Sequence, residues 1–375
     1  MRPLLVDLEM QWRGGQNQAL LMLKGLHARG HCAELVAAKG SALGERAQAA
    51  DIPVHYVSRE LFRIPAARKI RELLRSAKFD VVHANEAHAA TAAWLALWGQ
   101  PSSTSVPFVI SRRVGYPIAK NRLALARYNR AARIIANSNW VAEQAAACGV
   151  PREKLAVVHE GVEIPPQLTV EQKQGARALW GISPDAPLLG CVGVLSPDKG
   201  QEWLIRALAE VRKEFPGAKL LLAGDGPCRQ RLEALARELG LTEPVIFAGF
   251  VPEVQTVYAA LDVFLLPSFF EALNNSLLAA MAYEIPSVAF DRGALGEIIE
   301  HGKSGLLVSG PNVPEISAAI VRLLREREFA RQLSECGRQR VEQNFSAAKM
   351  VDSTLKLYDE VFVNKPAAEP RRAKM

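Results

Sequence analysis

Short apolar runs alternate with amphipathic stretches along the whole chain, and this alternation predicts an α/β fold. In the first half, runs rich in aliphatic residues predict buried strands at Pro3–Val6, Glu34–Ala37, Val54–Val57, Asp80–His83, Phe108–Ile110 and Arg133–Ala136. Between them the spacing becomes helical, as in Gln18–Arg29, where Leu20, Leu23 and Leu26 share one face. Strands that alternate with helices are typical of a parallel sheet covered by helices.

The second half repeats this rhythm. Its predicted strands are Leu188–Val192, Lys219–Ala223, Val245–Phe247, Val263–Leu266, Ser287–Phe290 and Gly305–Val308. Between the halves, Pro165 and Pro166 prevent a helix from continuing. We therefore predict two Rossmann-like, doubly wound domains at residues 1–165 and 166–345, then a helix at 346–363. The tail 364–375 has few bulky apolar side chains, and we expect it to be disordered.

Composition fits a folded protein of two domains, since the 375 residues are 49% hydrophobic and 23% charged. The five cysteines are scattered and form no C-x-x-C pair, which argues against a disulfide framework or a cysteine-based zinc site and indicates a reducing cytoplasm. The apolar start is too short for a signal peptide, and the stretch Ala87–Trp98 is well short of the roughly 20 residues that span a bilayer.

Charge is unevenly distributed along the chain. Residues 1–163 hold 22 basic and 13 acidic side chains, a net charge of +9, whereas residues 164–375 have a net charge of −2. This asymmetry predicts an anionic partner for the first half. Basic residues mix with apolar ones in Arg59–Lys78 and Arg112–Arg133, which favours an anionic membrane surface; alternatively, the apolar residues form core and the charges face water. We find no nucleic-acid-binding motif or aromatic stacking platform, and expect no nucleic-acid partner.

Glycine-rich turns follow several predicted strands. They comprise Gly14-Gly15-Gln16, Gly193–Gly200 with Lys199, and Gly224-Asp225-Gly226. Open α/β sheets bind ligands at the carboxyl ends of their strands, beside helix N-termini. A lysine there can neutralise a diphosphate, although each turn by itself is also compatible with a purely structural role.

The most informative stretch is Pro267–Ala282. Glu271 lies between a buried strand and a helix expected to begin near Asn274. A carboxylate in this place can accept hydrogen bonds from sugar hydroxyls, while backbone N–H groups at the helix start can hold phosphate. The alternative is that Glu271 only caps the helix.

The order and spacing of these motifs resemble the retaining family-4 glycosyltransferases of the GT-B fold, over nearly the whole chain. Other motifs that carry the resemblance are Asp80–His83, Ala136–Ser138, Glu160–Glu163 and Phe247–Phe250. The resemblance implies two Rossmann-like domains around a central cleft, with the donor nucleotide on the second, the acceptor on the first, and the last helix crossing back to the first. It also implies that no cofactor or metal is required, because lysine, arginine and a helix N-terminus replace a metal at the diphosphate.

The resemblance further assigns residues to roles. It makes Glu271 and Lys199 catalytic. It places donor contacts at Gly14, Gly15, Gln16, Gly193, Lys199, Gly224, Gly249, Phe250, Glu271, Asn274, Asn275 and Ser276. Acceptor or diphosphate contacts are expected at Arg112, Arg113 and His83. The expected reaction moves a sugar from a nucleotide-sugar to a lipid-linked or polysaccharide acceptor in lipopolysaccharide, glycolipid or other cell-envelope glycan synthesis. The expected location is the cytoplasm, peripherally on the inner face of the membrane.

Three positions depart from the family pattern. Val194 stands where the family commonly has arginine, Ala279 stands where it has a second glutamate, and Ser111-Arg112-Arg113 stands where it often has a histidine. Two alternatives therefore stay open at this point. One is a degenerate GT-B scaffold that no longer binds a donor, and the other is a GT-B sugar-nucleotide epimerase.

Overall fold

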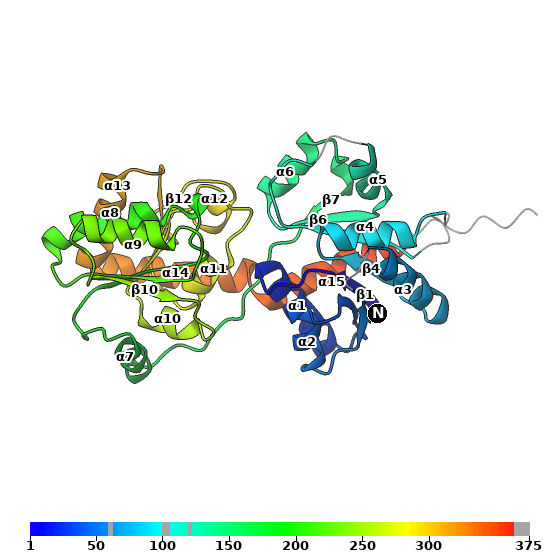
Figure 1. Ribbon diagram of the computed structural model, residues 1–375, viewed down its shortest axis with the longest axis horizontal. Coiled ribbons are helices and arrows are strands. Elements are labelled where there is room, and N and C mark those ends of the chain that lie inside the picture. Colours follow the sequence, from blue (N-terminus) through cyan, green and yellow to red (C-terminus); the bar gives the residue numbers. More distant parts are fainter. Residues whose placement is uncertain (59–62, 100–105, 119–121, 364–375) are drawn as a thin grey trace, which may run out of the picture. The chain divides into compact units, whose positions relative to one another are not determined.

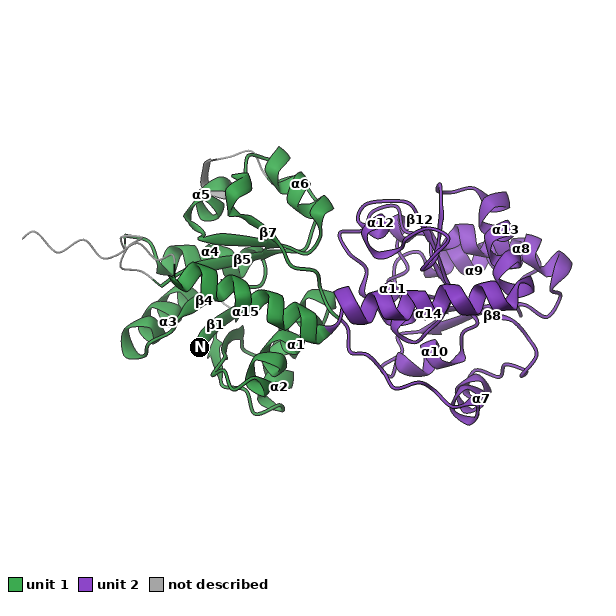
Figure 2. Cartoon of the chain, turned by 180° about the vertical axis from the view of Figure 1, so that it is seen from behind, with its two compact units in different colours: residues 1–161, 347–375 green, residues 162–346 purple. Residues whose placement is uncertain are grey.

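The structure is a computed structural model that describes residues 1–58, 63–99, 106–118 and 122–363. The chain forms two compact units, Met1–Gly161 with Ala347–Met375, and Val162–Ser346 (Figure 2). The predicted tail 364–375 lies outside the described residues. The second unit begins at Val162 rather than at residue 166, because the Val162 N–H donates to Phe345 O at 2.9 Å and the Val162 side chain packs into that unit's core.

The first unit contains a seven-stranded parallel sheet of order β3-β2-β1-β4-β5-β6-β7. Its strands are β1 (Pro3–Asp7), β2 (Glu34–Ala38), β3 (Val54–Val57), β4 (Val81–Ala84), β5 (Phe108–Arg112), β6 (Arg133–Ala136) and β7 (Leu155–Val157). The six predicted strands are present within two residues of their expected limits. Sequence reasoning missed β7, because it is a three-residue edge strand that is only partly buried.

Helices cover both faces of this sheet (Figure 1). They are α1 (Gly14–Ala28), α2 (Ala42–Gln48), α3 (Arg63–Ser76), α4 (Ala87–Ala96), α5 (Arg122–Arg130), α6 (Asn139–Ala147) and α15 (Ala347–Val363). Successive strand residues point to opposite faces, so Leu4 joins the core that includes α3 and α4, while Leu5 joins the core that includes α1 and α15. The last helix thus completes the first unit although it follows the second in sequence.

The second unit contains a six-stranded parallel sheet of order β10-β9-β8-β11-β12-β13. Its strands are β8 (Leu188–Val192), β9 (Lys219–Ala223), β10 (Val245–Gly249), β11 (Val263–Leu266), β12 (Ser287–Phe290) and β13 (Leu306–Val308). Its helices are α7 (Val170–Leu179), α8 (Gln201–Glu214), α9 (Arg229–Glu238), α10 (Gln255–Ala260), α11 (Asn275–Ala282), α12 (Leu295–Ile298), α13 (Val313–Arg325) and α14 (Arg327–Asn344). All six strands predicted for this half are present.

Each sheet has a point where the strand order reverses. It lies between β1 and β4 in the first unit and between β8 and β11 in the second. Connections on the two sides of such a point leave the sheet in opposite directions and open a crevice at the carboxyl ends of the strands, where ligands bind in this class of fold. Functional residues are therefore expected after β1 and β4 in the first unit and after β8 and β11 in the second.

The two basic stretches contain α3 and α5, and part of their apolar side chains is buried in the protein. In α3, Ile70 and Leu73 are buried in the core of the first unit, whereas Ile64 is 49% exposed, so the later part of this apolar face is covered by protein. In the second stretch, Ile118 and Arg112 are buried as well. Residues 59–62 and Lys120 lie outside the described residues. Among the helices that the structure describes, we find none with both the length and the apolar content needed to cross a bilayer.

Candidate functional site

The reversal point of the second sheet brings Lys199 and Glu271 together. Lys199 ends a turn after β8, and Glu271 lies in the loop after β11. Lys199 Nζ donates to Glu271 Oε1 at 2.7 Å. The Glu271 side chain is only 7% exposed, whereas that of Lys199 is 25% exposed. A buried carboxylate thus faces a lysine that still reaches solvent.

Asn274 joins this pair to the start of α11. Its Nδ2 donates to Glu271 Oε1 at 2.9 Å, and its Oδ1 accepts from Leu277 N at 2.8 Å as the helix N-cap. Glu271 therefore does not cap α11 itself; Asn274 does so. The positive end of the helix dipole lies beside the carboxylate, where an anion is favoured.

The next two residues differ in what their side chains do. Ser276 is hydrogen-bonded to the buried phenol of Tyr258, so its side chain serves packing. Asn275 Oδ1 is buried and has no hydrogen-bond partner among the described residues. Leaving a buried acceptor unsatisfied costs about 1–3 kcal/mol, so a donor from a ligand would be favoured there.

Two glycines hold the Glu271 loop in place. Gly200 has φ +65°, and a Cβ on it would lie 2.3 Å from Pro267 O. Gly293 has φ +59°, and a Cβ on it would lie 2.2 Å from Glu271 O, which accepts from Ala294 N at 2.9 Å. Only glycine permits these approaches, so the backbone at Glu271 is fixed by its neighbours.

The glycines after β8, β9 and β10 also meet at the carboxyl edge of the sheet. A Cβ on Gly224 would lie 1.9 Å from Gly193 O, and Gly224 N donates to Gly249 O at 2.7 Å. Phe250 follows directly and is 77% exposed. The structure thus brings these predicted donor residues to one edge with Lys199. Val194, also on this edge, is 57% exposed and adds no charge.

The first unit has a buried polar cluster at its own reversal point. Asp7 ends β1 and is 1% exposed. Its Oδ2 accepts from Gln16 Nε2 at 3.0 Å and from Asn85 Nδ2 at 2.6 Å. Helix α1 begins at Gly14, so Gly14, Gly15 and Gln16 form its first turn, and Asp7 holds the Gln16 side chain inside the protein.

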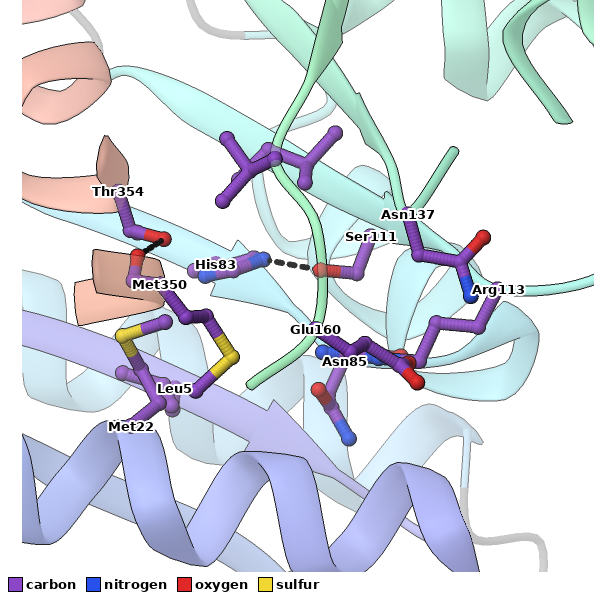
Figure 3. Close-up of a pocket in the computed structure, with 12 residues that line it drawn as sticks. Leu5, Met22, His83, Asn85, Ser111, Arg113, Asn137, Glu160, Met350 and Thr354 are labelled. Atoms are coloured by element: carbon purple, nitrogen blue, oxygen red, sulfur yellow. Dashed lines mark hydrogen bonds and ion pairs between the residues drawn. The ribbon is translucent and has the colours of Figure 1, made fainter. Parts of the chain in front are cut away.

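Arg113 and Arg112 point in opposite directions, as successive extended residues do. Arg113 Nε pairs with Glu160 Oε1 at 2.9 Å, and its Nη1 donates to Asn85 O at 2.7 Å, which keeps it at the carboxyl edge (Figure 3). Arg112 is buried and donates instead to the Tyr128 hydroxyl at 3.2 Å and to Tyr116 O. Of the two arginines, Arg113 is the one placed to meet a ligand at this edge.

His83, on β4, lines the pocket of the first unit that Figure 3 shows, and its side chain contacts β5 and α15. Its Nε2 is 2.7 Å from Ser111 Oγ on β5, and its Nδ1 is 2.6 Å from the Tyr358 hydroxyl on α15 (Figure 3 shows the first contact). Burial, with a smaller contribution from the Arg113 charge, lowers the pKa of His83 to about 3. The ring is therefore neutral and both nitrogens are engaged, which is the state of a structural histidine.

Glu86 adds a second carboxyl group close to Asp7. It caps α4 and accepts from Ala89 N at 2.6 Å and from Leu8 N at 3.3 Å. Burial, and then the charge of Asp7, raises the pKa of Glu86 to about 7. Burial also raises the pKa of Asp7. This edge can therefore hold or release a proton near neutral pH.

Sequence reasoning assigned no role to four residues of this cluster. The residues are Asp7, Asn85, Glu86 and Glu160. Their shared signal is a polar residue at or just after the carboxyl end of an apolar strand. The described residues contain no group of three or more His, Cys, Asp or Glu side chains arranged to hold an ion.

Two family comparisons cover most of the chain. Residues 12–164 match the family Glycosyltransferase Family 4, and residues 186–326 match Glycosyl transferases group 1. The second match contains Lys199, Glu271 and Asn274, and the first contains Asn85 and Arg113.

Individual relatives agree with these families. The lipopolysaccharide core biosynthesis glycosyltransferase LpsE of Rhizobium meliloti is 28% identical over 81% of this chain and 82% of its own length. A GDP-mannose-dependent alpha-(1-6)-phosphatidylinositol monomannoside mannosyltransferase of Mycobacterium tuberculosis is 33% identical, but over only 45% of this chain and 47% of that protein. The solved structure of Anabaena HepE in complex with UDP and glucose has a TM-score of 0.84 at 22% identity, covering 96% of this chain and 99% of HepE.

Proposed function

Because the chain belongs to the family-4 glycosyltransferases of the GT-B fold, we propose that it is a retaining enzyme that moves a sugar from a nucleoside-diphosphate sugar to a hydroxyl group. The observation that carries this proposal is the cluster of Lys199, Glu271 and Asn274 at the reversal point of the second sheet. It combines a cation, a buried carboxylate and a helix N-terminus, which together suit a sugar diphosphate.

Each member of the cluster has a separate task. Lys199 neutralises the diphosphate as it leaves, since a preorganised charge stabilises developing negative charge. Glu271 accepts hydrogen bonds from the donor-sugar hydroxyls, and backbone N–H groups at Asn274–Ser276 bind phosphate oxygens. Lys199 and Glu271 bond to each other, so both side chains lie within reach of one sugar diphosphate.

The glycines and Phe250 complete the proposed donor site. Gly193, Gly224 and Gly249 approach one another closely at the carboxyl edge, and we propose that the nucleotide lies along this edge with the exposed Phe250 beside the base. No described side chain here pairs a nucleophile with a base in the way that double displacement requires. We therefore propose front-face departure and attack on the same side of the sugar, with catalysis by positioning and charge stabilisation.

On the acceptor side we propose a lipid-linked or polysaccharide substrate in cell-envelope glycan synthesis. Support comes from the relatives, which include a lipopolysaccharide core enzyme and a phosphatidylinositol mannoside enzyme. Arg113, oriented by Glu160, is the proposed contact for an anionic group of the acceptor. We place the enzyme on the inner face of the cytoplasmic membrane, where nucleotide-sugars and lipid-linked acceptors meet.

The first experiment is a screen of nucleotide-sugars that records release of nucleoside diphosphate, followed by nuclear magnetic resonance of the product to read its anomeric configuration. Retention is expected, and so is full activity in excess EDTA, since Lys199 replaces a metal in the proposal. Inversion, or loss of activity with EDTA, would contradict these parts of it. Conversion of the donor sugar without any acceptor would instead identify an epimerase.

The second experiment is Glu271→Gln, with the exposed Glu253→Gln as control. Glu271→Gln should unfold at the wild-type temperature but lose at least about a hundredfold in turnover, the scale of one lost transition-state contact. Glu253→Gln should keep wild-type activity. Near-normal turnover of Glu271→Gln would show that Glu271 does not contact the donor sugar. If the wild type binds no nucleoside diphosphate at all, the protein is a degenerate scaffold.

A further inference from the structure

A basic and aromatic surface lies on the first unit, away from its polar cluster. We call it the Trp98 surface and define it by Trp94, Trp98, Arg130, Arg133 and Lys154. These residues come from the end of α4, the end of α5 and the starts of β6 and β7. None of them belongs to the proposed donor or acceptor contacts.

Trp98 is the most exposed part of this surface. It follows α4 and is 64% exposed. Its ring lies 5.0 Å from that of Trp94, which packs partly against the core of the unit. Trp94, Trp98 and Arg130 line one surface pocket. The indole is thus held in place by a second indole while most of its apolar area remains in water.

Basic groups gather beside the two indoles. Lys154 Nζ donates to Ala131 O at 3.0 Å and to Asn129 O, so its ammonium group lies at the end of α5 next to Arg130. Burial lowers the pKa of Lys154, and the charges of Arg130 and Arg133 lower it further, against an opposing effect of Glu153. Cations that crowd one another in this way favour an anion close by.

Topology separates this surface from the candidate acceptor site. Helix α4 connects parallel strands, so its end at Trp98 lies at the amino edge of the sheet. Arg133 is the first residue of β6, and Lys154 directly precedes β7. Asp7 and Arg113 lie at the carboxyl edge, and a five-residue strand is about 17 Å long. A partner on the Trp98 surface therefore leaves the acceptor edge open.

We propose that the Trp98 surface docks on an anionic phospholipid membrane. Indoles with one apolar body and one N–H donor concentrate at the level of lipid headgroups. Basic side chains near them are attracted by the negative potential of an anionic leaflet. Arg130, Arg133 and Lys154 bind lipid phosphates, while the Trp98 indole enters the headgroup layer. This docking does not depend on the proposed function, and it is measured without turnover.

The first test is co-sedimentation with phosphatidylcholine vesicles that contain increasing phosphatidylglycerol. Binding of the wild type should rise with the anionic fraction and fall with salt, because surface charges are screened. Trp98→Ala should weaken binding by about tenfold, and Leu179→Ala, at a comparably exposed apolar site on α7 of the second unit, should leave it unchanged. If the wild type stays in the supernatant at low salt, or if Trp98→Ala binds like the wild type, the proposal is wrong.

The second test asks whether vesicle binding depends on the Trp98 surface or only on the net charge of the protein. Arg133→Gln/Lys154→Gln should reduce vesicle binding by about tenfold or more, whereas Arg206→Gln/Lys173→Gln removes the same charge from exposed sites of the second unit and should have little effect. Equal losses in the two double variants would overturn the proposal. So would a Trp98→Ala variant that changes only self-association in sedimentation velocity, since the occupant would then be a second copy of the chain.

A third measurement locates the indole and tests the link to catalysis. Lipids brominated near the headgroup should quench the wild-type tryptophan fluorescence, and Trp98→Phe should remove most of that quenching. Trp98→Ala should release nucleoside diphosphate at the wild-type rate with a water-soluble acceptor. Vesicle binding without any transferase activity would reject the proposed function and keep the docking surface, whereas transfer without vesicle binding would do the reverse.

Discussion

At the scale of single residues, Lys199 is the clearest test of the donor site, because its ammonium group is the only cation paired with Glu271 among the described ion pairs. Lys199→Ala should weaken nucleoside-diphosphate binding by at least about tenfold but hardly affect nucleoside binding, since its charge acts on the diphosphate. Isothermal titration of the two ligands measures this difference. The control is Lys303→Ala, which removes an exposed lysine that is not among the proposed donor contacts. Equal losses for both ligands would make Lys199 a structural residue.

His83 gives a second prediction at this scale, about pH. Its pKa is about 3 in the folded protein because of burial, against about 6.5 in an unfolded chain. Its stabilising contribution is therefore complete above pH 6.5 and is lost as the pH falls toward 3. Between pH 6.5 and 5 the first unit should lose about 2 kcal/mol from this group. Glu86, whose pKa burial raises to about 7, acts in the opposite direction over this range, so the His83 contribution is the difference between the wild type and His83→Gln. Native-state hydrogen exchange of β4 amides measures it, with β11 amides as an internal control. His83→Gln should make these amides relatively more stable as the pH falls; identical pH dependences would mean that another group takes up the proton.

At the scale of elements, the loop after β12 holds the loop after β11. Gly293→Ala would place a Cβ 2.2 Å from Glu271 O and must displace the carboxylate. Gly302 has the same kind of backbone, φ +75°, with nothing within 4 Å of its Cβ, so Gly302→Ala carries the conformational cost without the collision. We expect about a hundredfold lower turnover for Gly293→Ala, the scale of a 1 Å misplacement, and near-normal turnover for Gly302→Ala. Similar activities in the two variants would show that the contact does not position Glu271.

At the scale of the whole molecule, the first unit depends on the end of the chain. A Cβ on Gly25 would lie 2.5 Å from Val351 Cγ2, so the Val351 side chain of α15 packs directly on the backbone of α1. Gly25→Val should loosen α15 and destabilise the first unit by about 1–3 kcal/mol, as overpacking does. Hydrogen exchange should show lost protection in β1 and β4 but not in β8 and β11. Gly175→Ala, at an open helical site of α7, should be neutral or slightly stabilising. Loss of protection in both units would contradict this division of stability.

The sequence by itself determined the fold class and the main motifs. Buried parallel strands appear in the sequence as apolar runs because both faces are covered, so twelve of the thirteen strands that the structure describes were predictable from local pattern. Lys199, Glu271 and Asn274 were recognisable because each stands in a turn after such a run. The edge strand β7 escaped because three partly exposed residues carry little pattern.

Tertiary structure alone decided which polar groups meet and which surfaces stay open. Arg112 and Arg113 are adjacent in sequence, yet the alternation of an extended chain buries one and keeps the other at the ligand edge. His83 became a structural residue only when α15 brought Tyr358 to it across the sequence. Trp98 is exposed while Ile70 and Leu73 of the basic helix α3 are buried, and only packing distinguishes these apolar residues. Strand pattern is local, whereas these outcomes depend on contacts between residues far apart in the chain.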